Sequence, residues 1–186
     1  RWIVDPLDGT TNYVHGFPAY CVSIALATEL GLEVGVVFDP IRDECFAARR
    51  GGGARLDGRP IRVPAVAALD DALVAVSFPP HVAADSVFME DFLAVAPRAH
   101  SIRRTGSTAL NLAYVASGRL HAFWARRIAC WDAAAGLLIA REAGAAVESF
   151  AVPAADVPLD DPAFIVASTP ALLGELRAVL GGDREG

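Results

Sequence analysis

The first third of the chain consists of short apolar runs separated by turn-forming residues. Runs rich in β-branched and aromatic residues between glycine, proline and aspartate clusters are typical of strands in an antiparallel sheet. Residues 1–4 form one such run, and the proline and glycine that come next predict a loop directly after it. Further strands are expected at residues 20–28, 33–38, 44–49, 61–63 and 72–78.

After residue 80 the apolar positions recur at the spacing that predicts amphipathic helices. We expect helices at residues 84–95, 107–116, 132–142 and 171–180, with short strands at 122–124 and 164–167. A β-rich half followed by alternating helices and strands indicates stacked layers of helix and sheet in an α/β (α+β) fold. We expect residues 1–186 to form a single domain with a frayed tail at residues 181–186.

The composition narrows the class of protein. With 54% hydrophobic residues, the chain of 186 residues has enough apolar side chains for a globular core. A net charge of −6 without a Lys/Arg-rich stripe argues against nucleic-acid binding. Charged residues interrupt each apolar run before about 18 residues, so no membrane span is expected. Cys21, Cys45 and Cys130 form no C-x-x-C pair, which favours free thiols in a reducing cytoplasm.

Two carboxylates flank a Pro-Leu pair at the end of the first predicted strand. Asp5 and Asp8 are near enough in the chain to point at one spot, and hard oxygen ligands placed this way suit Mg²⁺. Gly9 and Thr10 follow at once, where a small residue permits close approach and successive N–H groups can hold a phosphate oxygen. The alternative is a turn capped by aspartate. Asp132, in the first turn of a predicted helix, has two interpretations as well: a metal ligand or an N-cap.

Three segments together resemble the signatures of the inositol monophosphatase family. The first is W-I-V-D-P-L-D-G-T-T-N at residues 2–12, and the second is W-D-A-A-A-G at residues 131–136. Between them, R-R-T-G-S-T-A-L-N-L at residues 103–112 is similar to the start of the family's substrate-side helix. The resemblance covers nearly the whole chain. It implies a layered sandwich of alternating helices and sheets, and Mg²⁺-dependent hydrolysis of a small phosphomonoester such as an inositol monophosphate.

The resemblance also implies a role for individual residues. The implied ligands of two or three Mg²⁺ ions are Asp5, the Leu7 carbonyl, Asp8 and Asp132. The implied substrate contacts are the Gly9 and Thr10 amides, with Gly106, Ser107 and Thr108 along the substrate. The Thr10 hydroxyl would orient the attacking water, which makes Asp5, Asp8, Thr10 and Asp132 the expected catalytic residues. Since metal-activated water attacks the ester, no Ser, Cys or His nucleophile is required. A homodimer is a further expectation from the family.

Two departures from the family pattern affect these expectations. Family members have an acidic ligand in a Gly-Glu motif upstream of the first signature, so we expect this chain to be a fragment without its N-terminal segment. Inositol-specific members also have a glutamate seven residues before the second-signature aspartate, where this chain has Ala125. That change weakens polyol recognition, and Arg126 with Arg127 favours a second anionic group. Phosphatases for histidinol phosphate, nucleotide 3′-phosphates or sugar bisphosphates remain alternatives, as does a non-catalytic binding or regulatory module.

Overall fold

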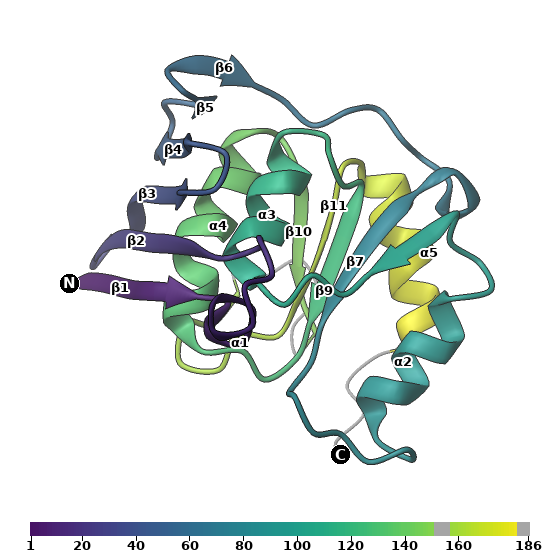
Figure 1. Cartoon of the computed structure of the whole chain (residues 1–186). Helices are drawn as coiled ribbons and strands as arrows, with labels where there is room; N and C mark the ends of the chain where they lie inside the picture. The colour runs from purple at the N-terminus through teal and green to yellow at the C-terminus, as the bar shows by residue number, and fades with distance from the viewer. Residues whose placement is uncertain (151–156, 182–186) are drawn as a thin grey trace.

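The computed structural model of the chain describes residues 1–150 and 157–181, which form two sheets and the helices packed on them (Figure 1). The first sheet is antiparallel and follows the order of the sequence, as expected for a meander. Its strands are β1 (Trp2–Asp8), β2 (Cys21–Thr28), β3 (Gly31–Asp39), β4 (Glu44–Arg49), β5 (Ala54–Leu56) and β6 (Arg59–Ile61).

The second sheet is mixed, in the order β10-β11-β9-β7-β8. Strand β7 pairs in parallel with β8 and β9, whereas β11 is antiparallel to β9 and β10. Its strands are β7 (Leu73–Ser77), β8 (Ser101–Arg103), β9 (Ala122–Ala125), β10 (Ala146–Ser149) and β11 (Phe164–Ala167).

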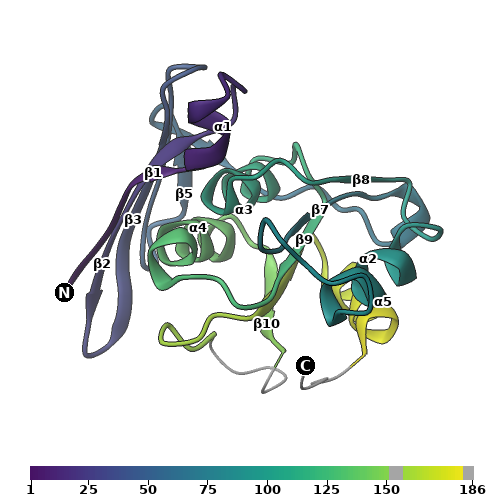
Figure 2. The same cartoon turned by 60° about the horizontal axis from the view of Figure 1, so that its bottom comes forward.

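Apart from α1, which follows β1 directly, the helices form one layer between the sheets and another outside the second sheet (Figure 2). The helices are α1 (Thr10–Val14), α2 (Val87–Val95), α3 (Thr108–Ala116), α4 (Cys130–Glu142) and α5 (Pro170–Leu180), with a 3₁₀ turn, η1, at Leu69–Asp71. Helices α3 and α4 pack against both sheets, and α2 and α5 cover the far face of the second (Figures 1 and 2). This arrangement confirms the predicted layered sandwich of helix and sheet.

The central helix α4 explains why its sequence is apolar on all sides. Every residue from 133 to 140 is buried, because one face of the helix meets the first sheet and the other meets the second. Small side chains let a helix approach two sheets closely. In the described residues, 1–150 and 157–181, no helix has the length and apolar character needed to cross a membrane.

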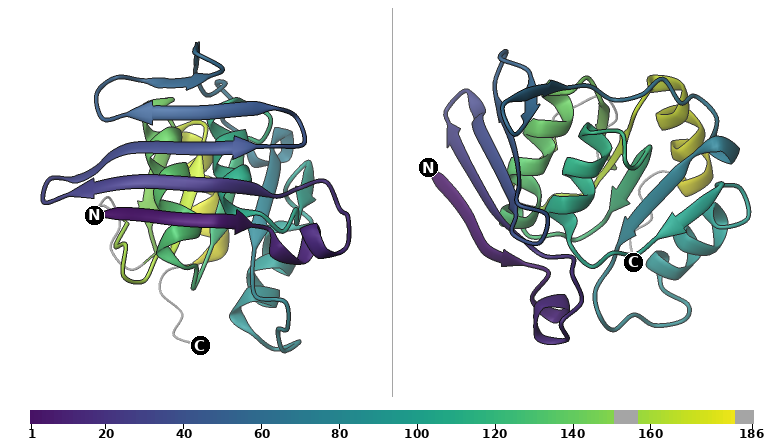
Figure 3. Two further views of the ribbon diagram at one scale, coloured as in Figure 1. Left: turned by 60° about the vertical axis from the view of Figure 1, so that its left-hand side comes forward. Right: turned by 45° about the horizontal axis from the view of Figure 1, so that its top comes forward.

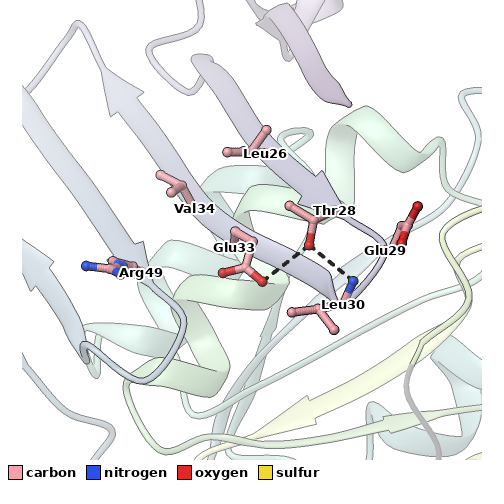
Figure 4. A pocket seen from close by; sticks show the side chains of 7 residues that line it. All are labelled: Leu26, Thr28, Glu29, Leu30, Glu33, Val34 and Arg49. Atoms are coloured by element: carbon pink, nitrogen blue, oxygen red, sulfur yellow. Dashed lines mark hydrogen bonds between the residues drawn. The ribbon is translucent and has the colours of Figure 1, made fainter.

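The face of the first sheet that is turned away from α3 and α4 lies open in the left panel of Figure 3. A shallow groove of about 580 Å³ lies at the β2–β3 hairpin, where Figure 4 draws its lining side chains. Leu30 in the hairpin turn is 80% exposed, and Leu26 and Val34 line the groove beside it.

Several predicted boundaries change in the structure. Strand β1 does not end at residue 4 but continues through Pro6 to Asp8. Its pairing with β2 shifts register between Asp5 and Asp8, and at such a bulge a proline, which has no N–H, is tolerated. The short elements α1, β5, β8 and β10 were not predicted. Of the predicted tail, residues 182–186 lie outside the described part.

Candidate metal and phosphate site

The bulge in β1 brings Asp5 and Asp8 to one place. In a regular strand, residues three apart point to opposite faces of the sheet. Here Asp5 pairs with Ser23 and Asp8 pairs with Cys21, so the first strand contains an extra residue between these positions. The backbone N–H of Leu7 donates to Asp5 Oδ1 at 2.9 Å. Two carboxylates that regular pairing would separate can therefore face the same spot.

Asp132 joins these carboxylates from the central helix layer. Helix α4 begins at Cys130 and its N-cap is Ala129, so Asp132 is the third helical residue and the N-cap interpretation is wrong. Asp5, Asp8 and Asp132 each offer an oxygen, and the three oxygens lie within 4.8 Å of one another. The structure therefore assembles the three predicted metal-ligating carboxylates from two separate layers.

The electrostatics of this cluster favour a cation. Burial, a hydrogen bond with Asp5 and the charges of Asp8 and Asp5 raise the pKa of Asp132 to about 8. Burial also raises the pKa of Asp8, against the opposing effect of the hydrogen bonds from Ser107 and Ala109. Crowded carboxylates resist ionisation together unless a positive charge lies between them. The donors are all hard oxygens, so the residues present fit Mg²⁺.

Asp8 is held rigidly by the start of helix α3. The Ser107 hydroxyl and the Ala109 N–H each donate to Asp8 Oδ2 at 2.7 Å. Ser107 also caps the helix, since its Oγ accepts the N–H of Leu110 at 3.3 Å. The Ser107 side chain is fully buried, and its hydroxyl contacts Asp8, so a direct contact of this side chain with a substrate stays a prediction. The hydroxyl orients the carboxylate of Asp8, which is a predicted metal ligand.

Asn12 connects the first signature to the loop before α3. Its side-chain amide donates to the carbonyl oxygens of Ala19 at 2.6 Å and Thr105 at 2.8 Å. Gly106 lies against this amide: its φ is 86°, and a Cβ there would lie 2.9 Å from Asn12 Nδ2. Asn12 was not among the predicted site residues, although its place in the first signature was an available signal.

Gly9 and Thr10 lie where β1 passes into the short helix α1. Gly9 has a φ of 90°, and a Cβ there would lie 2.7 Å from the carbonyl oxygen of Ala19, so only glycine fits without strain. Thr10 is the first helical residue and is exposed, and its hydroxyl donates to the Leu7 carbonyl at 2.9 Å. The Leu7 carbonyl, a predicted metal ligand, therefore accepts a hydrogen bond from the residue predicted to orient water.

A cleft of about 550 Å³ opens beside the carboxylates. Of the predicted site residues, its lining contains Asp8, Gly106, Thr108 and Asp132. Asp5, Leu7, Gly9 and Thr10 lie outside that lining, although Asp5 belongs to the carboxylate cluster. The other lining residues were not among the predicted site residues. They are Thr11, Asn12, Ser77, Phe78, Pro79, Pro80, Arg104, Arg127, Ile128 and Ala129.

Comparisons with known proteins agree with this geometry. The chain is 48% identical over 146 residues to the inositol-1-monophosphatase of Rhizobium meliloti (strain 1021), a match that covers 77% of this chain and 54% of that protein. It is 44% identical over 152 residues to the Nus factor SuhB of Pseudomonas aeruginosa, covering 80% and 56%. The chain thus spans about half the length of the curated relatives it matches.

A solved structure of another protein has the same fold as this chain. The extragenic suppressor protein suhB from Bartonella henselae superposes with a TM-score of 0.88 at 39% identity, covering 97% of this chain and 71% of that one. The model of the inositol monophosphatase family matches residues 1–180. The chain therefore belongs to the inositol monophosphatase family.

Proposed function

We propose that the chain contains the metal- and phosphate-binding site of a Mg²⁺-dependent phosphatase that hydrolyses a small phosphomonoester of the inositol monophosphate type. The observation that supports it most is the cluster of Asp5, Asp8 and Asp132 at the edge of a cleft large enough for a small ligand. Divalent cations bound there would neutralise the phosphate and lower the pKa of water.

Each residue around the cluster has a role in this proposal. Asp5, Asp8 and Asp132 hold the cations together with the Leu7 carbonyl, and the Ser107 hydroxyl fixes the orientation of Asp8.

The phosphate lies at the start of α1, where the Gly9 and Thr10 N–H groups donate to its oxygens. The Thr10 hydroxyl donates to the Leu7 carbonyl at 2.9 Å, which leaves its oxygen lone pairs to accept a hydrogen bond from the attacking water and so to orient it. Gly106 and Thr108 line the cleft along the leaving group.

The test is release of inorganic phosphate from inositol 1-phosphate, histidinol phosphate, a nucleotide 3′-phosphate and a sugar bisphosphate, with Mg²⁺ and with EDTA. Asp132→Asn should abolish release, whereas the exposed Asp70→Asn should not change it. A second measurement does not need turnover: Mg²⁺ should raise the Tm of the wild type but leave that of Asp132→Asn unchanged. Release that persists in EDTA would refute the metal-dependent mechanism.

A non-catalytic binding module is the second candidate, because relatives at 44–46% identity are named Nus factor SuhB. That candidate predicts neither phosphate release nor a Mg²⁺-dependent change in Tm. The proposed homodimer is tested separately, by light scattering at several protein concentrations.

A further inference from the structure

The lining of the cleft contains side chains of both charges. Asp8 and Asp132 are acidic, and Arg104 and Arg127 are basic. Arg104 follows β8, and its guanidinium lies 4.5 Å from the centre of the Phe78 ring. Its Nη2 donates to the carbonyl oxygens of Phe78 at 3.2 Å and Pro79 at 3.5 Å. These contacts with Phe78 and Pro79 therefore hold the positive charge of Arg104 in the lining of the cleft.

Arg127 occupies a strained backbone position. Its φ is 54°, in the left-handed region that favours glycine. In residues 1–150 and 157–181 the other non-glycine residues with positive φ are Asp43 and Asp57, whose short polar side chains tolerate this region. A long side chain at a backbone position that suits glycine suggests that the side chain itself has a use.

The neighbouring Arg126 has a different environment, which separates the two arginines. Arg126 is 7% exposed, and its Nε lies 2.7 Å from Asp91 Oδ2. Its guanidinium also stacks over the Phe150 ring at 3.6 Å. Arg126 is thus a buried structural residue, whereas Arg127 is exposed and lines the cleft, so the expectation of a second anionic group is developed for Arg127.

The end of β9 offers no polar side chain in this region. Ala125 is fully buried, so this position has neither a carboxylate nor a hydroxyl with which to bind sugar hydroxyls. Selection among phosphate esters must then depend on other groups of the cleft, and the charged lining residues besides Asp8 and Asp132 are Arg104 and Arg127.

We propose that Arg127, with Arg104, is a specificity-determining residue that binds a second anionic group of the substrate. The substrate class is a small phosphate ester with a further phosphate or carboxylate: the reacting phosphate lies at the carboxylate-bound cations and the second anion at the arginines. This inference rests on the proposed phosphatase function. A cleft of about 550 Å³ has room for both groups on one small sugar or polyol.

The test compares pairs of ligands that differ by one anionic group. Inositol 1,4-bisphosphate against inositol 1-phosphate tests a second phosphate, and 2-phosphoglycerate against glycerol 2-phosphate tests a carboxylate. In at least one pair, we expect the wild type to prefer the member that has two anionic groups. In Arg127→Gln, KM for that member should rise about tenfold, since a charge-assisted hydrogen bond is lost, while KM for the monophosphate changes little.

Two further variants separate charge from backbone conformation. Arg127→Gly removes the guanidinium and also relieves the positive φ, so it should lose the preference without lowering Tm. Arg59→Gln removes an exposed arginine from β6, at the opposite edge of the first sheet from β1, and should keep the preference. Equal KM ratios in the wild type and both Arg127 variants would overturn the inference.

A binding measurement keeps this result distinct from failure of the phosphatase proposal. Where the esters are not hydrolysed, titration calorimetry with the same four ligands and Mg²⁺ gives Kd for the wild type and Arg127→Gln. If no ester is hydrolysed but the bisphosphate or the phosphoglycerate binds about tenfold more weakly to Arg127→Gln, the phosphatase proposal fails and the anion site remains. If the wild type binds neither the bisphosphate nor the phosphoglycerate more tightly than the matching ligand with one anionic group, the inference is wrong.

Discussion

Replacing Asp132 with asparagine should stabilise the metal-free protein while abolishing its response to Mg²⁺. Burial, a hydrogen bond with Asp5 and the charges of Asp8 and Asp5 raise the pKa of Asp132. Asparagine has nearly the same shape but no charge, so it removes both the cost of burying a charge and the repulsion. The folded-state pKa of about 8 exceeds the ordinary value of 3.8. The stability that protonated Asp132 contributes is therefore complete below the lower pKa and is lost as the pH rises through the higher one.

The magnitude follows from these values. If solvent screening is ignored, a change in the pKa of Asp132 from 3.8 to about 8 corresponds to about 6 kcal/mol in the free energy of unfolding. The Asp132 side chain is only partly buried, and solvent screening and local relaxation reduce this greatly. We expect a gain of about 1–2 kcal/mol for Asp132→Asn near pH 8.5 in EDTA, which is a Tm rise of about 2–8 °C for a chain of this size.

The assay is thermal unfolding of the wild type and Asp132→Asn between about pH 5 and pH 8.5, with EDTA and with saturating Mg²⁺. In EDTA the advantage of the variant should grow with pH. In Mg²⁺ the wild type should gain about 3 kcal/mol at a concentration of about 100 Kd, and the variant should not. The exposed Asp70→Asn serves as the control. A variant that is less stable than the wild type in EDTA at alkaline pH would refute the reasoning.

Three further substitutions test the support around the site. Ser107→Ala removes both the helix cap and the 2.7 Å bond to Asp8, so it should lower stability by about 1–2 kcal/mol and weaken Mg²⁺ binding in titrations; an unchanged Mg²⁺ affinity would contradict the orienting role. Gly106→Ala introduces a side chain at a φ of 86° and should cost about 1–3 kcal/mol in urea unfolding; a neutral result would show that the loop relaxes freely. Asp91→Asn removes the ion pair of the buried Arg126 and should lower the free energy of unfolding by about 3–5 kcal/mol. A loss of stability near zero would mean that the pair is solvated.

The elements that could be predicted from sequence are those whose local pattern agrees with their environment. Strands β4 and β11 have the predicted bounds, 44–49 and 164–167, because each is short, apolar and flanked by turn residues. Helices α3 and α4 begin within two residues of the predicted starts. The layered fold follows from this order of elements, and the structure confirms it.

The errors occur where tertiary contacts override local preference. Pro6 predicted a loop, but pairing with β2 extends the strand by means of a bulge, which no local pattern reveals. Strands β8 and β10 are short and lie at the edges of the second sheet. They are extended because they pair with a neighbouring strand, which their own sequences do not predict. The placement of Ser107 along the substrate came from the family resemblance of residues 103–112, and local sequence could not show that its side chain is buried against Asp8, because that depends on how α3 packs.

The origin of the three carboxylates in two layers has a mechanical consequence. Asp5 and Asp8 belong to the edge strand β1, and Asp132 belongs to a helix more than a hundred residues further along the chain. A cation held by all three would act as a removable cross-link between the edge of a sheet and the helix behind it. Fraying of β1 and release of the cation would then be one event, visible as faster amide exchange in β1 when EDTA is added.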